Sequence, residues 1–247
     1  MSESDATLPL PLRPPRREFI GQLATAAAAL AATACVSGGA LGAATATPAP
    51  KDALPKLTPQ PPLPKIEFDD AWTNRLTGKY RAVFDSPDIE DGTAVFNAYS
   101  YMKGFKDMYK LADADVNAVV VIRHKAIPML LDDEMWSRYK LGEYTKTKEF
   151  GSDKWVTRNP FLNAAPGDTE DAEYAMSALT KRGVIFLGCA MATQGMAGIL
   201  AKRSGDKPDA MFDELRRHLI PGLTLQPSGI FAVMRAQAAG CHYMRST

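Results

Sequence analysis

The chain has 247 residues, of which 46% are hydrophobic and 23% are charged, so it holds enough apolar material for a buried core. Its 29 Lys and Arg residues nearly balance its 28 Asp and Glu residues. This balance excludes the basic footprint of a nucleic-acid-binding protein, and no nucleic-acid partner is expected.

The first 46 residues have the pattern of a secretory signal. Arg16 and Arg17 precede Phe19, and an uncharged, alanine-rich run follows at 21–34. A charged stretch, a short apolar run and a small-residue cleavage site define such signals. The paired arginines with Phe19 resemble the twin-arginine (Tat) export signal of bacteria. Cleavage is expected after Ala46, which would release a periplasmic protein.

Two alternatives concern the same segment. Cys35 follows Ala32-Thr33-Ala34, which loosely resembles a lipoprotein box whose cysteine is acylated, although a larger aliphatic residue is usual at position 32. The run at 21–34 could also be a helix of the domain, but it lacks a polar face. It is too short to span a membrane, which takes about 20 strongly apolar residues, so no transmembrane span is expected in the mature form.

The segment 47–65 is rich in proline, with prolines at positions 48, 50, 55, 59, 61, 62 and 64. Proline fixes φ and lacks an amide donor, so this segment is predicted to be an extended linker without a core of its own. The folded domain is then expected to cover residues 66–247, a length typical of one domain.

Strands and helices are predicted to alternate along the domain. The segment 116–122 is an almost continuous apolar run, which is typical of a strand buried on both faces of a parallel sheet. The predicted strands are 80–85, 116–122, 184–188, 223–226 and 241–244, and the predicted helices are 89–111, 126–139, 169–181, 190–203, 208–218 and 230–239. The pattern predicts an α/β fold: a single three-layer domain with about five mostly parallel strands flanked by helices.

A long polar, aperiodic segment at 140–168 interrupts this alternation. A loop of such length in a compact domain is usually a lid, a binding loop or an oligomer contact.

The C-terminal third resembles the DsrE/DsrF-like family. The similar stretches are Arg-Gly-Val-Ile-Phe-Leu-Gly-Cys at 182–189, Pro-Gly-Leu and Pro-Ser-Gly-Ile within 219–230, and the closing segment 236–244, with a weaker likeness at 119–124. The resemblance implies a five-stranded, mostly parallel sheet, homo-oligomers that are often trimers or multiples of them, and sulfur transfer in some members. The export signal and the 140–168 loop depart from the cytoplasmic sulfur-relay members.

Cys189 is the leading candidate for a reactive group. It stands where a strand is predicted to end and a helix to begin, and ligands gather at that edge of open α/β sheets. A helix N-terminus favours a thiolate, which can hold sulfur as a persulfide or undergo reversible oxidation. The alternative is a small buried hydrophobic residue. Cys241 is expected at the opposite end of the sheet, so the two are predicted not to form a disulfide.

Five further residues are candidates for the same site. His124 ends the second predicted strand and could act as a base or a metal ligand, or be a hydrogen-bonded loop residue. Arg123, Arg158 and Asn159 could bind an oxyanion such as thiosulfate. Ser228 could contact substrate, although the cap of the following helix is its default role. No zinc, Walker or dinucleotide motif occurs, so no metal or cofactor is expected.

Two functions remain open from the sequence. The first is an exported sulfur carrier or thiol-redox protein that uses Cys189 and exchanges sulfur with a donor or acceptor protein. The second is a non-enzymatic periplasmic protein that binds a small ligand or assembles as an oligomer. A carrier of a metal or cofactor would suit the Tat route, but the sequence offers no ligand cluster for it. No classical enzyme activity is expected.

Overall fold

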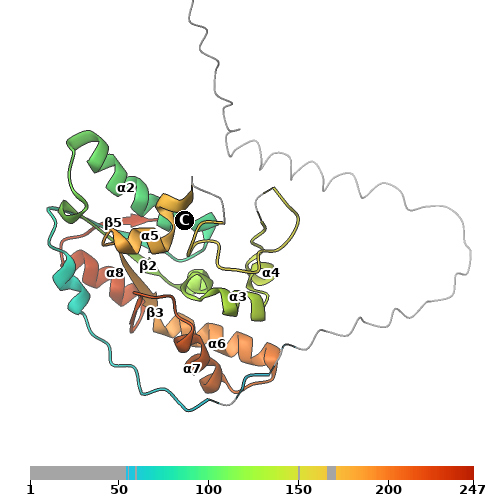
Figure 1. The fold of residues 1–247 in the computed structure, drawn as a ribbon. Helices are drawn as coiled ribbons and strands as arrows, with labels where there is room; N and C mark the ends of the chain where they lie inside the picture. The colour runs from blue at the N-terminus through green and yellow to red at the C-terminus, as the bar shows by residue number, and fades with distance from the viewer. Residues whose placement is uncertain (1–53, 55, 59, 150, 166–170) are drawn as a thin grey trace, which may run out of the picture. The chain divides into compact units, whose positions relative to one another are not determined.

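Five parallel strands form one sheet in the computed structural model, which describes residues 54, 56–58, 60–149, 151–165 and 171–247 (Figure 1). Their order across the sheet is β4-β3-β2-β1-β5, and every neighbouring pair is parallel. This confirms the predicted fold class. The strands are β1 (Tyr80–Ser86), β2 (Val116–Ile122), β3 (Ile185–Cys189), β4 (Thr224–Gln226) and β5 (His242–Arg245).

Helices cover both faces of the sheet and give the domain its three layers (Figure 1). One face packs against α8 (Gly229–Ala238) and η1 (Ala71–Arg75). The other face carries the larger core, to which the remaining helices contribute. These are α2 (Thr93–Tyr109), α3 (Asp133–Arg138), α4 (Leu141–Thr145), α5 (Met176–Lys181), α6 (Ala190–Ser204) and α7 (Pro208–Arg217).

The central strand β2 explains why the sheet is buried on both sides. All seven of its residues are buried, as the apolar run predicts. Val119 and Val121 face α8, whereas Val120 and Ile122 join the core on the other face. The alternation follows from the two-residue period of a strand, so each helical layer receives every second side chain.

Besides η1, four short 3-10 helices lie between the larger elements of the described chain: η2 (Glu90–Gly92), η3 (Asp113–Asp115), η4 (His124–Leu130) and η5 (Asp171–Tyr174). The α2 helix begins at Thr93, later than the predicted 89, because Asp91 and Gly92 have positive φ values of 51° and 77°. Such left-handed residues cannot continue a right-handed helix.

The described part of the segment 140–168 is packed against the rest of the domain. It includes α4, in which Leu141 is fully buried, and an isolated bridge between Lys148 and Trp155. Gly142 lies so close to the backbone of Val156 that a Cβ atom there would overlap its carbonyl oxygen. The absence of a side chain at this position is what allows the approach.

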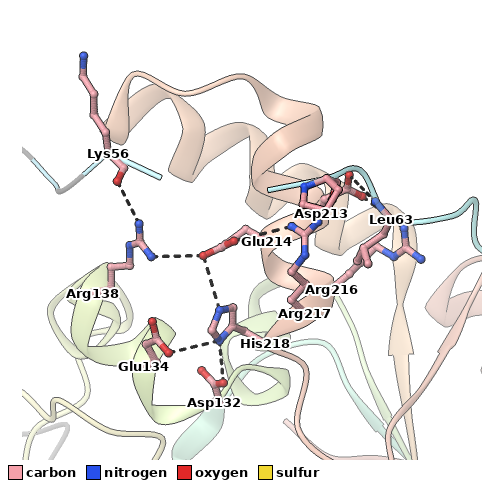
Figure 2. A network of polar contacts seen from close by, with 11 residues as sticks. Lys56, Leu63, Asp132, Glu134, Arg138, Asp213, Glu214, Arg216, Arg217 and His218 are labelled. Atoms are coloured by element: carbon pink, nitrogen blue, oxygen red, sulfur yellow. Dashed lines mark hydrogen bonds and ion pairs between the residues drawn. The ribbon is translucent and has the colours of Figure 1, made fainter. Parts of the chain in front are cut away.

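The described part of the proline-rich segment lies against α7 and α3 (Figure 2). The amide of Leu63 donates to Asp213 Oδ2 at 3.1 Å, and Arg216 Nη1 donates to the carbonyl of Pro64 at 2.8 Å. Arg217 donates to the carbonyl of Pro61. Leu54 and Leu57 also pack against the larger core of the domain.

A polar network beneath this segment joins α3 to α7 (Figure 2). His218 Nδ1 lies 2.8 Å from Asp132 Oδ2, and Arg138 Nη1 donates to Glu214 Oε1 at 3.3 Å. Arg138 also donates to the carbonyl of Lys56 at 3.2 Å. The network therefore links the proline-rich segment to the body of the domain.

The predicted signal residues Arg16, Arg17 and Phe19, the cleavage residue Ala46 and the alternative lipidation residue Cys35 lie outside the described residues. Among the residues that are described, no helix combines the length and apolar character needed to cross a membrane.

Candidate functional site

Cys189 connects the end of β3 to the beginning of α6. Its backbone is extended, and its side chain caps the helix: Sγ accepts a hydrogen bond from the amide of Ala192 at 3.3 Å. The hydroxyl of Thr193 donates to the carbonyl of Cys189 at 2.9 Å and tightens the first turn. The sulfur therefore lies at the positive end of a fifteen-residue helix, with an N–H group directed at it. Cys189 as a whole is only 6% exposed to solvent.

Arg123 directly follows the neighbouring strand β2 and lies beside Cys189. The β2–β3 register pairs Ile122 with Gly188, so the next residue of each chain, Arg123 and Cys189, stand level at the carboxyl edge of the sheet. This is the edge at which open α/β sheets bind their ligands. The structure thus places two of the predicted site residues together.

A buried carboxylate orients Arg123. Its Nε donates to Asp85 Oδ1 at 2.7 Å and its Nη2 donates to Asp85 Oδ2 at 2.9 Å, a bidentate pair. Tyr243 adds a third bond, with its hydroxyl 3.0 Å from Asp85 Oδ2. Partial burial and this hydrogen bond raise the pKa of Tyr243, so the phenol stays protonated as the donor. Asp85 therefore joins β1, β2 and β5 at one point.

The electrostatics of this edge connect the guanidinium to the thiol. The pKa of Arg123 is raised, mainly by its hydrogen bonds to Asp85, and a negative charge at Cys189 acts in the same direction. Arg123 therefore places a permanent positive charge beside Cys189 at the carboxyl edge of the sheet. The pair Arg123 and Cys189 is the chemical centre of the candidate site.

The N-terminus of α8 closes the site around the arginine. Ser228 caps this helix, and its Oγ accepts from the amide of Phe231 at 3.1 Å. Gly229 follows, and a Cβ atom there would lie 2.5 Å from Cβ and 2.6 Å from Cδ of Arg123. Only glycine allows this approach, so the start of α8 fixes the stem of the arginine. Ser228 has the capping role in this structure.

Gln226 flanks Cys189 on its other side. The two residues are register partners in β3 and β4, and Gln226 is buried. Its amide nitrogen donates to the carbonyl of Asp69 at 2.9 Å. The amide therefore ties the chain entering the domain to the strand next to the thiol.

His124 is exposed just beyond Arg123 and begins η4 with a positive φ of 53°. Its imidazole makes no hydrogen bond or ion pair with another described residue, so no contact joins it to Cys189. The sequence places it on the correct edge of the sheet, and the structure leaves its ring in solvent there.

Arg158 and Asn159 hold the 140–168 segment in place. Both amide hydrogens of Asn159 are used, in bonds to the carbonyls of Met129 at 2.9 Å and Leu131 at 2.8 Å. Its Oδ1 accepts from the amide of Phe161 at 3.0 Å. Arg158 Nη1 donates to the carbonyl of Asn163 at 3.1 Å. With its donors engaged, Asn159 cannot bind an anion in this arrangement, so its role here is structural.

Cys241 immediately precedes β5, and the strands β1 and β2 lie between β5 and β3 in the sheet. Cys189 and Cys241 are both free and buried. Burial raises the pKa of the Cys241 thiol to about 11. The two buried thiols therefore differ in their surroundings: an amide donor and a nearby cation accompany Cys189, whereas the thiol of Cys241 is held protonated.

Three residues of the site were missed by sequence reasoning: Asp85, Tyr243 and Gln226. Asp85 carried a usable signal, because an acidic residue directly follows the apolar run Ala82–Phe84 at the same edge as Arg123. Tyr243 and Gln226 carried none, since their roles depend on which strands are neighbours. No group of three metal-binding side chains is found among the described residues.

Comparisons with other proteins add little to this site. No family model matches the chain, and no curated protein matches it. A protein of unknown function from Methanobacterium thermoautotrophicum is among the solved structures similar to it, with 20% sequence identity and a TM-score of 0.37. The similarity covers 68% of this chain and 99% of that one.

Proposed function

We propose that this protein is an exported sulfur carrier that holds sulfur as a persulfide on Cys189. The observation that carries the proposal is the placement of the sulfur: it accepts an amide hydrogen bond at the N-terminus of α6 and lies level with Arg123 across the strand pair. A helix N-terminus and a neighbouring cation are the two features that lower the cost of a thiolate. The resemblance to DsrE/DsrF-like proteins points in the same direction.

The proposed chemistry is a sulfur transfer without net oxidation. The thiolate of Cys189 attacks the outer sulfur of a persulfide donor, R–S–SH. A new S–S bond forms to Cys189, the S–S bond of the donor breaks, and R–S⁻ leaves. The terminal proton stays with the transferred sulfur, and a terminal persulfide anion would be stabilised by the guanidinium of Arg123. Reversal with an acceptor thiolate returns Cys189 to its starting state.

Intact and peptide mass spectrometry of the full chain, before and after exposure to glutathione persulfide, tests the proposal. We expect a gain of one sulfur atom on the peptide that contains Cys189, and none on that peptide in Cys189→Ser. Cys241 is the matched control, because it is equally buried but has a raised pKa. Sulfur added equally to both cysteines, or to neither in the folded protein, would contradict the proposal.

The variant Arg123→Gln distinguishes the electrostatic role of Arg123 from its effect on how easily a reagent reaches the thiol of Cys189. The variant keeps a long polar side chain but removes the charge, so we expect slower persulfide formation while the thiol stays equally accessible to a neutral alkylating reagent. An unchanged transfer rate would remove Arg123 from the mechanism.

Location and assembly form part of the same proposal. The Tat-like segment supports export to the periplasm, and cell fractionation with N-terminal mapping of the mature chain tests both export and the Cys35 alternative. On α8 the large apolar side chains of Ile230, Phe231 and Met234 are exposed. This surface supports a homo-oligomer that is a trimer or a multiple of a trimer. Light scattering after size-exclusion chromatography would measure the mass of that oligomer.

A further inference from the structure

A second site lies at the other end of the sheet, in a pocket of about 850 Å³ between α2 and α5. Arg182 lines this pocket and lies three residues before β3 begins, whereas Cys189 ends that strand. A five-residue strand spans on the order of 15 Å, so the pocket is separate from the thiol. Its volume falls in the range of roughly 300–1,000 Å³ usual for small-molecule sites.

One face of each helix supplies the pocket. Tyr99, Lys103 and Lys106 recur along α2 at spacings of four and three, which places them on one side of that helix. Ala178 and Lys181 belong to α5 and line the opposite wall. One face of α2 and one face of α5, both carrying lysines, therefore line the same pocket.

The carboxylates of the lining are already engaged. Asp107 forms an ion pair with Lys103 within α2, and Glu173 Oε2 accepts from the hydroxyl of Tyr99 at 2.9 Å. The charges of Asp107 and Lys103 therefore match each other without help from a ligand.

Arg182 is engaged as well, by a carboxylate just beyond the pocket. Its Nε and Nη2 each donate to Asp113 at 2.9 Å, which raises the pKa of the guanidinium and lowers that of the carboxyl group, in both cases mainly through the hydrogen bonds. Arg182 therefore lines the pocket with a fixed guanidinium group whose positive charge Asp113 already compensates.

Lys106 and Lys181 are the lining cations without such a partner. Within the part of the chain that the structure describes, neither ammonium group makes a hydrogen bond or an ion pair, although the charge of Lys106 is felt by Asp107 and Asp113. The rest of the lining is largely small and apolar, with alanines at 164, 172, 175 and 178. Small side chains leave room for a ligand. With Lys103 paired to Asp107 and Arg182 paired to Asp113, the two remaining lysines outweigh the single carboxylate of Glu173, so the lining keeps a net positive charge.

We propose that this pocket binds a small organic anion. Its carboxylate, sulfonate or phosphate group is held by Lys106 and Lys181, and its apolar body lies against the alanines and the ring of Tyr99. A fully hydrated inorganic anion would use the lysines but gain nothing from the apolar lining. The ligand class is therefore an anion with a compact apolar part. This binding function does not depend on the chemistry of Cys189.

Fluorescence titration with 8-anilinonaphthalene-1-sulfonate tests the site, because the dye combines a sulfonate with an apolar body. We expect saturable binding to the full chain and at least a tenfold weaker affinity in the double variant Lys106→Glu/Lys181→Glu. Ala178→Trp should weaken binding by a similar factor, since it fills the pocket without changing its charge. Loss in both variants assigns binding to the pocket and its charge together.

The double variant Lys202→Glu/Lys207→Glu is the matched control, because it changes the net charge by the same amount at exposed positions of α6 and the start of α7. It should bind the dye as the unmodified protein does. Equally weakened dye binding in both double variants would show that net charge alone controls binding, which would contradict the proposal. Dye binding that none of the three variants alters would place the dye elsewhere, as on the exposed face of α8, and would overturn the proposal.

Discussion

Arg123 and Asp85 form a bidentate ion pair that joins the carboxyl ends of β2 and β1, with Nε–Oδ1 at 2.7 Å and Nη2–Oδ2 at 2.9 Å. The side chain of Asp85 is only 4% exposed, so the carboxylate has lost most of its water. The pair also aims the guanidinium at the edge of the sheet where Cys189 lies. One interaction therefore serves both the stability of the sheet edge and the charge of the candidate site.

Arg123→Ala should destabilise the fold by about 3 kcal/mol, because it leaves a buried carboxylate without its partner. Arg182→Ala is the matched control: it breaks a bidentate pair of the same geometry, but Asp113 is 36% exposed and water replaces the lost partner. A surface pair of this kind contributes about 1 kcal/mol or less. Urea denaturation measures both free energies of unfolding, and equal losses would contradict the burial argument.

The five strands and the longer helices could be predicted because they carry local signals. The predicted helix at 169–181 was only partly correct, because Ala175 is extended and limits α5 to Met176–Lys181. The β2 strand was predicted at its observed bounds, since its apolar run leaves no other interpretation. The boundary near residue 89 was less accurate, because nothing in the sequence shows that Asp91 has a positive φ before α2 begins. The parallel orientation of the strands could be predicted because strands alternate with helices along the chain.

The candidate site was predicted only in part, because its contacts depend on strand order. Tyr243 reaches Asp85 across 158 residues of sequence, since β5 adds to the sheet beside β1. The pocket between α2 and α5 was not predicted either. Lys103 and Lys106 look like an ordinary solvated helix face until α5 is seen to lie opposite them.

Cys189→Ser and Cys189→Ala should differ in stability although both remove the thiol. Serine is a preferred N-cap and can accept the hydrogen bond from Ala192, so the free energy of unfolding should stay within about 0.5 kcal/mol of the unmodified protein. Alanine leaves that amide without its cap and should cost about 1 kcal/mol. Thermal and urea denaturation measure the difference. Equal stability of the two variants would show that the cap contributes nothing.

Gly229→Ala should be destabilising, because the added methyl group would lie 2.5 Å from the Arg123 Cβ atom. Either α8 or the arginine must move, and the second movement would also strain the bond to Asp85. We expect a loss of about 1–3 kcal/mol, the range typical of overpacking. Gly195→Ala in α6 meets no atom within 4 Å and should instead stabilise by about 0.5–1 kcal/mol. Urea denaturation of the two variants tests the contrast.

The fold should lose stability in alkaline solution. Burial raises the pKa of Cys241 from 9.0 to about 11, so the folded state retains this proton between those pH values while the unfolded state releases it. The contribution is complete below pH 9 and is lost as the pH rises toward 11. Cys241→Ala should flatten the fall in the free energy of unfolding across this window. An identical pH profile for this variant would contradict the assignment.

Docking of the proline-rich segment on α7 should protect it from proteolysis. Lys56 and Lys65 flank the docked stretch, and the amide of Leu63 is held by Asp213 in its centre. Asp213→Ala removes that acceptor and frees Arg216, so trypsin should cleave at these lysines several times faster than in the unmodified protein. Asp209→Ala, on the same helix but outside the docking contacts, is the control. Cleavage that is equally fast in all three proteins would show that the segment is not held on α7 in solution.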